Sequence, residues 1–317
     1  MTPFDPALFD AVRRGERRAL AKSITLLEST RADHRGHADA LLNALLPFTG
    51  EALRLGFSGV PGVGKSTFIE ALGLHLITQG LRVAVLAVDP SSSVSGGSIL
   101  GDKTRMERLS VHDAAYIRPS PASGTLGGVA EKTREAMLVC EAAGYDVVIV
   151  ETVGVGQSEA AVASMTDMFI LLQLPNAGDD LQAIKKGVME LADLALINKA
   201  DIDPAAAMRA QAQITGATHT QVMQVSALRG DGVAAVWDAA RDFRSRREAS
   251  GEFATRRRDQ ALAWMWDIVH ARLQAAFNEH PAVASALPQT LSDVAAQRMA
   301  PSAAARALLD LYQTTRP

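Results

Sequence analysis

From about residue 50 to residue 230, short apolar runs alternate with stretches of helical periodicity. The runs are nearly continuous in Val, Ile, Leu and Ala, whereas a strand with one solvated face would alternate apolar and polar residues. Such strands are buried on both faces, which is typical of a mainly parallel sheet covered by helices. We predict strands at Leu53–Ser58, Arg82–Asp89, Asp146–Glu151, Met168–Leu174, Leu194–Asn198 and Gln221–Ser226.

Helical patterns lie on both sides of this region. Residues 6–46 carry apolar side chains at helical spacing, up to a turn signal at Pro47–Gly50. After residue 230 the strand signals stop, and we predict helices over 231–248, 255–280 and 301–313. A helical tail of about 70 residues does not easily form a core of its own, so we expect it to pack on the main domain or on a second copy.

A phosphate-binding loop follows the first predicted strand. Gly59-Val60-Pro61-Gly62-Val63-Gly64-Lys65-Ser66 fits G-x-x-x-x-G-K-[ST] at every position, and a predicted helix follows it. Glycines let the backbone N–H groups point inward at phosphates, and the helix adds its positive N-terminal end. The residues predicted to hold a nucleotide here are Gly62, Val63, Gly64, Lys65, Ser66 and Thr67.

The loop and the strand pattern together predict the organisation of the chain. The fold class is α/β, a P-loop NTPase with a mainly parallel, doubly wound sheet and helical extensions at both ends. We expect an N-terminal helical extension over 1–50, the P-loop domain over 51–248 and a C-terminal helical arm over 249–317.

A second motif indicates which base the nucleotide carries. Asn198-Lys199-Ala200-Asp201 is N-K-x-D, at the end of a predicted strand. The Asp201 carboxylate can accept two hydrogens from guanine, and adenine offers no such pair. The Lys199 stem can lie along the base, and Asn198 can hold the loop together. Ser226, Ala227 and Leu228 follow a later strand, where we expect a second loop that contacts the base.

Carboxylates near the ends of two strands are candidates for a magnesium site. Asp89 ends the second strand, and Asp102 lies in the polar, Gly-rich stretch after it, which is also a candidate switch. Glu151-Thr152-Val153-Gly154 follows the third predicted strand, where small GTPases have D-x-x-G. Ser66, Asp89, Asp102 and Glu151 are the predicted metal ligands, and Gly154 the predicted γ-phosphate contact. Val155 stands where a Ras-like protein has its water-orienting Gln, so we expect slow intrinsic hydrolysis.

Composition sets limits on the partners. The 317 residues carry 32 basic and 35 acidic side chains and a formal net charge of −3, which argues against a general nucleic-acid coat. The single cysteine, Cys140, argues against a disulfide framework and fits a reducing cytoplasm. We see no secretory signal and no membrane-length apolar run.

Seven arginines between Arg241 and Arg258 suggest either an anionic partner or a solvated helical connection with local ion pairs, and we favour the second.

Longer segments resemble a known family. Gly-Val-Pro-Gly-Val-Gly-Lys-Ser-Thr, Asp-Pro-Ser-Ser-Ser, Gly-Gly-Ser-Ile-Leu-Gly-Asp-Lys-Thr-Arg-Met, Arg-Pro-Ser-Pro-Ala-Ser-Gly-Thr-Leu-Gly-Gly-Val and Glu-Thr-Val-Gly-Val-Gly-Gln-Ser-Glu together resemble the MeaB/MMAA family, formerly named ArgK. The resemblance runs from about residue 10 to 275, and the stretches at 96–106 and 118–129 are its most specific parts.

The resemblance implies a function. Members are SIMIBI-class GTPases and homodimers that act as chaperones of adenosylcobalamin-dependent acyl-CoA mutases, with GTP gating cofactor delivery from an adenosyltransferase. The resemblance implies that GTP or GDP binds together with Mg²⁺ and that the residues named above have the roles given there. It also implies a further switch segment at 176–186. Lys185 in that switch is our candidate for a cation that acts in hydrolysis when the mutase docks. Asn176 stands where the family usually has Gly.

Two other classes of function are alternatives. A P-loop kinase linked to amino-acid transport would normally take ATP, which the N-K-A-D sequence argues against. A nickel-insertion GTPase would need a cluster of Cys and His ligands, and only His34 and His37 form a close pair. Which acyl-CoA mutase is the partner is left open by the sequence.

Overall fold

The structure is a computed structural model of the 317-residue chain. It describes residues 5–88, 106–119, 126–152, 158–175, 186–218 and 220–314. It divides into two compact units, Met1–Arg258 and Asp259–Pro317. Within the described ranges, no helix combines the length and the apolar composition that a membrane span requires.

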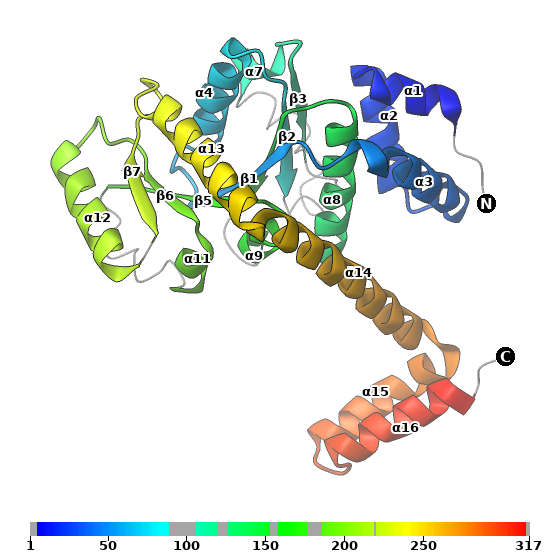
Figure 1. Cartoon of the computed structure of the whole chain (residues 1–317). Coiled ribbons are helices and arrows are strands. Elements are labelled where there is room, and N and C mark those ends of the chain that lie inside the picture. The colour runs from blue at the N-terminus through cyan, green and yellow to red at the C-terminus, as the bar shows by residue number, and fades with distance from the viewer. Residues whose placement is uncertain are drawn as a thin grey trace. The chain divides into compact units, whose positions relative to one another are not determined.

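The first unit is built on a seven-stranded sheet in which every described pairing is parallel. The strand order is β3-β2-β4-β1-β5-β6-β7 (Figure 1). Nearly all residues of the five inner strands are buried, which confirms the reading of their continuous apolar runs. The strands are β1 Leu53–Gly59, β2 Val83–Val88, β3 Ala115–Arg118, β4 Val147–Thr152, β5 Met168–Gln173, β6 Leu194–Ile197 and β7 Gln221–Gln224.

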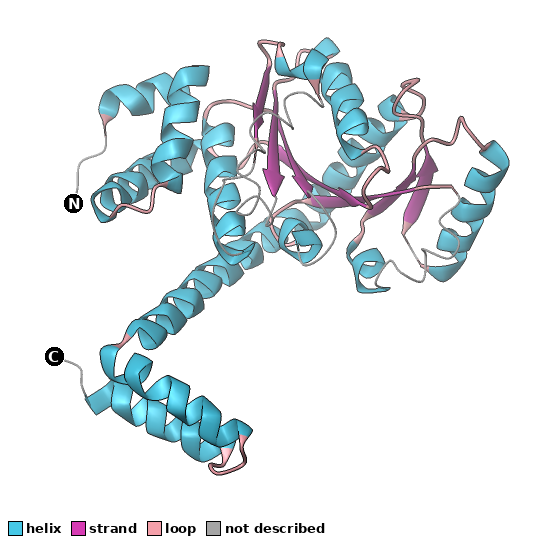
Figure 2. Cartoon of the chain, turned by 180° about the vertical axis from the view of Figure 1, so that it is seen from behind, coloured by secondary structure: helices cyan, strands magenta, loops and turns pink. Residues whose placement is uncertain are grey.

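Helices cover both faces of this sheet, as the doubly wound prediction requires (Figure 2). One face packs against α4 (Lys65–Thr78), α7 (Glu107–Ser110) and α13 (Val233–Ser250), which contribute Phe68, Leu109 and Trp237 to one apolar cluster. The other face packs against helices that supply a second cluster, namely α8 Leu126–Ala142, α9 Ser158–Ala163, α11 Lys186–Leu191 and α12 Pro204–Ala217.

The N-terminal extension is three helices rather than one. They are α1 Pro6–Arg13, α2 Arg17–Glu28 and α3 Ala32–Leu45, and the short 3₁₀ turn η1 Leu46–Phe48 follows. Gly15, at a φ of +74°, breaks the first helix from the second. Leu20, Ile24 and Leu27 are buried in the cluster that includes α8, so the extension is part of the first unit's core.

The strand order has a switch point at β1. From β1 the chain crosses to β2, β3 and β4 on one side, and it continues with β5, β6 and β7 on the other. A doubly wound sheet binds its ligands at such a switch point, outside the carboxyl ends of the strands. The loop after β1 therefore lies where this architecture places a ligand.

The second unit contains most of α14 (Glu252–Glu279), α15 (Pro281–Ala295) and α16 (Pro301–Thr314). The sequence patterns predict α14 and α16, but they miss α15, which holds Pro288 in its interior. Val283 and Ala304 are buried in this unit, and the Tyr312 ring packs against Phe277 and His280 at centroid distances of 5.5 and 5.3 Å.

The arginines of α13 and early α14 make ion pairs within the first unit. Arg257 binds both oxygens of the Asp167 carboxylate, at 2.8 and 2.6 Å, and donates to the backbone oxygens of Gly50 and Ala52. Arg247 and Arg256 each form an ion pair with one oxygen of Asp193, at 3.4 and 3.7 Å. These partners are distant in sequence, and only 14% of the Arg257 side chain is exposed. The expected local ion pairs are present, for example Arg244 with Glu248 at 2.6 Å, but as many of the described pairs are long-range and partly buried.

Replacing Arg257 should destabilise the first unit strongly. Arg257→Ala would leave the Asp167 carboxylate, only 1% exposed, without its cation, and losing one partner of a buried pair costs about 3–5 kcal/mol. Urea unfolding of the full chain measures this loss. Arg241→Ala is the control, because Arg241 and Asp238 are both more than half exposed and such a pair is worth about 0–1 kcal/mol. Equal losses of unfolding free energy in the two variants would contradict a buried, stabilising ion pair between Arg257 and Asp167.

Candidate functional site

Two glycines of the loop after β1 have no room for a side chain. Gly64 has a φ of +95°, and a Cβ built there would lie 2.6 Å from the Asn198 Nδ2 atom. A Cβ on Gly59 would lie 2.5 Å from the backbone oxygen of Leu172 on β5. Gly64 directly precedes α4 and has no side chain with which to cap it. The first N–H groups of α4 therefore suit an anion, as the predicted phosphate loop requires.

Lys65 places its ammonium group against the same loop. Its Nζ atom donates to the backbone oxygen of Gly59 at 2.6 Å and to that of Val60 at 3.4 Å, and the residue is only 9% exposed. A buried cation needs negative partners, which carbonyl dipoles supply here and an anionic ligand would supply more strongly. Thr67, the last residue of the predicted loop, is exposed.

Ser66 and Glu151 come together from β1–α4 and β4. The Ser66 hydroxyl donates to Oε1 of Glu151 at 3.0 Å, and Glu151 is 5% exposed. Adjacent oxygens of an octahedral Mg²⁺ shell with bonds of about 2.1 Å lie about 3 Å apart, so these two hard oxygen donors fit that ion. Among the described residues no group of three or more His, Cys, Asp and Glu side chains could hold a metal.

Asn198 joins three loops at the carboxyl edge of the sheet. Its Nδ2 atom donates to the backbone oxygen of Val63 at 2.8 Å, and its Oδ1 atom accepts from the backbone N–H of Ala227 at 3.0 Å. Lys199, at a φ of +61°, donates from Nζ to the backbone oxygen of Gly62 at 2.9 Å. The N-K-A-D segment is thereby tied to the phosphate loop and to the loop after β7.

Asp201 presents a charged carboxylate beside these loops. A hydrogen bond from the Ser226 side chain, together with the nearby Arg229 guanidinium, lowers the pKa of Asp201, so it is an anion at neutral pH. Its side chain is 14% exposed. Leu228 is 86% exposed, so it is available to a ligand but has little contact with the protein.

Four predicted site residues lie outside the described residues: Asp89, Asp102, Gly154 and Lys185. The structure also adds residues that the sequence analysis passed over. The Thr152 hydroxyl donates to the Ser58 hydroxyl at 3.0 Å, and both residues are buried directly beside the phosphate loop and Glu151. Arg229 lies 3.4 Å from the Asp201 carboxylate. All three lie next to predicted residues in the sequence, Ser58 before Gly59, Thr152 after Glu151 and Arg229 after Leu228, but their contacts are not visible there.

Asn198 should contribute more to stability than an ordinary buried amide. Asn198→Ala would leave the Val63 oxygen and the Ala227 N–H without their partner, at about 1–3 kcal/mol for each buried group. We expect Asn198→Asp to be at least as harmful, because it places a carboxylate at a 1% exposed position against the Val63 carbonyl oxygen. Thermal and urea unfolding of both variants measure the difference. A loss below about 0.5 kcal/mol for Asn198→Ala would contradict the bridging role.

Comparisons with known proteins agree with this geometry. The family model described as methylmalonyl Co-A mutase-associated GTPase MeaB matches residues 20–282. GTPase ArgK of Escherichia coli is 52% identical over 265 residues, covering 80% of each chain. The mouse methylmalonic aciduria type A homolog, mitochondrial, is 44% identical over 332 residues, covering 98% of this chain and 80% of that protein.

A solved structure extends the likeness to the whole fold. The crystal structure of LAO/AO transport system kinase superposes with a TM-score of 0.80 at 38% identity, and the match covers 97% of both chains. The family model itself spans most of the 317 residues. Because the family model matches most of the chain and both relatives are more than 40% identical over at least 80% of it, the chain belongs to the MeaB family of methylmalonyl-CoA mutase-associated GTPases.

Proposed function

We propose that this GTPase is a chaperone of an adenosylcobalamin-dependent acyl-CoA mutase, which is methylmalonyl-CoA mutase or a paralogue. In this role GTP binding and hydrolysis gate cofactor delivery and help to protect or reactivate the mutase. The observation that carries the proposal is the family match over residues 20–282, whose description names association with that mutase. The name of the mouse relative, which refers to methylmalonic aciduria, supports it.

The site supports a guanine nucleotide bound between two sets of loops. We assign the phosphates to the backbone N–H groups of Gly62–Thr67 and to Lys65, whose Nζ atom would exchange the carbonyls of Gly59 and Val60 for phosphate oxygens. We assign the base to Asp201, with Lys199 along its plane and the loop from Ser226 to Leu228 beside it. Asn198 would act by holding these loops in register, because its amide is committed to backbone groups.

Mg²⁺ completes the proposed site. Ser66 and Glu151 would hold the ion directly or through water, and Asp89 and Asp102 are the further candidates. When bound, Mg²⁺ would offset negative charge on the β- and γ-phosphates. Glu151 would exchange its hydrogen bond from Ser66 for a contact to the ion or to its water. Gly154 is the proposed backbone contact to the γ-phosphate.

Hydrolysis is proposed to be slow without the mutase. Val155 provides no amide where Ras-like proteins have the Gln that orients water, so an activating group must come from elsewhere. Lys65 and Glu151 are the proposed catalytic groups within the site. Lys185, from the 176–186 segment, is the cation that we propose to act when the mutase docks.

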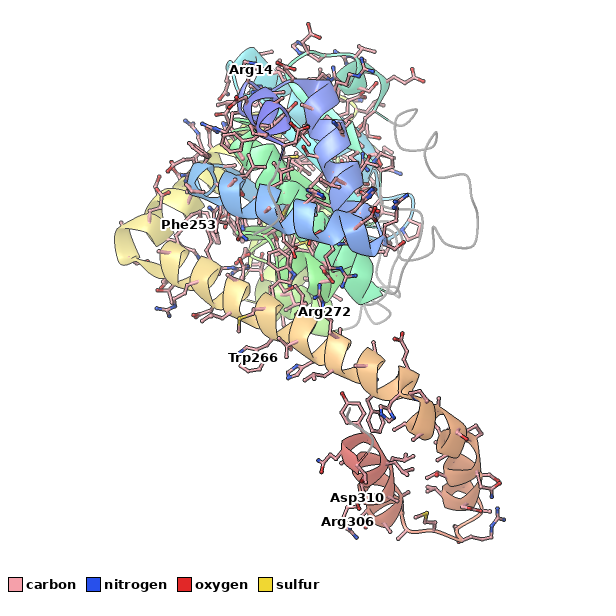
Figure 3. The ribbon with its side chains drawn as sticks, turned by 90° about the vertical axis from the view of Figure 1, so that its right-hand side faces the viewer. Arg14, Phe253, Trp266, Arg272, Arg306 and Asp310 are labelled. Carbon is pink, nitrogen blue, oxygen red and sulfur yellow. The ribbon has the colours of Figure 1, made fainter. Side chains whose placement is uncertain are left out.

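A second copy of the chain is the other proposed partner. Apolar side chains at helical spacing run along α14, and Leu262, Trp266 and Leu273 are 51%, 54% and 54% exposed. Figure 3 labels Trp266 on this helix, where its ring projects from the ribbon. Such a stripe on a helix suits burial against another helix, so we propose a homodimer in which the C-terminal arm takes part.

Further partners follow from the family role. We propose that a cobalamin adenosyltransferase supplies the cofactor, and we propose no nucleic-acid or membrane partner. A cytoplasmic location is also proposed, which agrees with the buried free thiol of Cys140. The mouse relative, by its name, is mitochondrial.

The kinase and nickel alternatives are weaker. The solved relative is named a transport system kinase. The ionised carboxylate of Asp201, the last residue of N-K-A-D, favours guanine over the adenine of ATP. Nickel insertion has no observation in its favour among the described residues.

Exchanging Asp201 should change the base that is bound. Asp201→Asn replaces an acceptor pair by one acceptor and one donor, which opposes the amine of guanine and matches the carbonyl of xanthine. We expect GDP affinity to fall at least about tenfold and XDP affinity to rise, since each lost or unmatched hydrogen bond costs about 1–3 kcal/mol. Titration calorimetry with GDP and XDP measures both. An unchanged preference for GDP would refute the base assignment.

The chaperone role predicts activation by the mutase. Single-turnover GTP hydrolysis should be slow for the protein alone and should rise when an adenosylcobalamin-dependent acyl-CoA mutase is added, with a cation effect of up to about 10³-fold. Lys185→Ala should retain the basal rate and lose most of the activation, whereas Lys22→Ala, an exposed lysine on α2, should behave as wild type. Equal activation in both variants would remove Lys185 from the mechanism. No activation by any acyl-CoA mutase would contradict the chaperone function itself.

A further inference from the structure

A guanidinium group lies against the carboxylate that is proposed to read guanine. Nε of Arg229 is 3.4 Å from Oδ2 of Asp201. The turn that carries Arg229 is well fixed, because its backbone N–H donates to Ser226 Oγ at 3.3 Å and Gly230 N–H donates to the Ser226 oxygen at 2.8 Å. The side chain itself is 63% exposed, so its guanidinium can leave the carboxylate for solvent.

The acceptor sites of the carboxylate are limited. An ionised carboxyl group has about four lone-pair positions. Arg229 Nε lies 3.4 Å from Oδ2, so one of the two carboxylate oxygens is already engaged by a cation. Guanine brings two donors, the ring N–H and the exocyclic amine, whereas hypoxanthine brings only the ring N–H.

We propose that Arg229 determines how sharply the site distinguishes guanine from hypoxanthine, by competing with the exocyclic amine for the Asp201 carboxylate. The inference rests on the proposed role of Asp201 as the guanine reader. Guanine must displace Arg229 to place both donors, and hypoxanthine can bind while the ion pair persists. Arg229 therefore weakens guanine binding selectively and acts on specificity through Asp201, as a positioning residue.

The affinity ratio of IDP to GDP tests this role. The two nucleotides have identical phosphates, so any general effect of removing a positive charge cancels in the ratio. In Arg229→Ala the Kd of IDP divided by that of GDP should rise about two- to fivefold, which is the range expected for loss of an exposed ion pair. Arg241→Ala removes an exposed, ion-paired arginine elsewhere and should leave the ratio unchanged. An unchanged or lower ratio in Arg229→Ala would overturn the inference.

Salt provides a test that needs no variant. Screening weakens an exposed ion pair, so the wild-type ratio should rise between low salt and about 0.5 M KCl and approach that of Arg229→Ala. If Arg229→Ala distorts the turn and weakens both nucleotides, Arg229→Gln and the wild-type salt series still decide the question. If the wild-type ratio of the IDP Kd to the GDP Kd does not change with salt, Arg229 does not compete with the guanine amine for Asp201. A wild-type protein that does not prefer GDP over ADP refutes the guanine site itself, which is a separate result.

Discussion

The Asn198 amide is the contact on which the geometry of the site depends most. It donates to the phosphate loop and accepts from the loop after β7, and it is itself 1% exposed at the end of β6. Each of the three loops follows a different strand, so none can set the position of the others through the backbone alone. Two hydrogen bonds from one buried side chain provide that register, and leaving either backbone group unsatisfied would be costly. Gly64 completes the constraint, since any side chain there would collide with the Asn198 amide.

Charge is distributed differently at the two ends of the sheet. At the carboxyl ends, Lys65 and Asp201 bond to groups that a nucleotide would replace: loop carbonyls for Lys65 and the Arg229 guanidinium for Asp201. At the amino ends, Arg257 and Asp167 are bound to each other and to backbone, with little exposure. The first kind of contact can be exchanged for a ligand. The second holds the beginning of α14 to β1 and β5.

Elements with one strong local signal were predictable from sequence, and elements that depend on their neighbours were not. The buried strands β1, β2, β4 and β5 each come from a continuous apolar run, because both faces of a parallel sheet are covered. β3, with four residues of sequence Ala-Tyr-Ile-Arg, has no such run and is a strand because it pairs with β2 at the edge. α15 contains Pro288 in its interior, so its local pattern is unfavourable, and packing against α16 compensates.

The sequence by itself determined the chemistry of this protein: the phosphate loop, the N-K-A-D segment, the Glu151 in place of Asp, and the family. These are local motifs in which residue type and spacing carry the function, because a backbone curl needs glycine and a base edge needs a carboxylate. Only the tertiary structure decided which residues meet. Ser66 with Glu151, Thr152 with Ser58, and Arg229 with Asp201 are separated by 85, 94 and 28 positions in the chain. Contacts of that kind depend on strand order and register, which periodicity does not specify, since the same apolar runs are compatible with several strand orders.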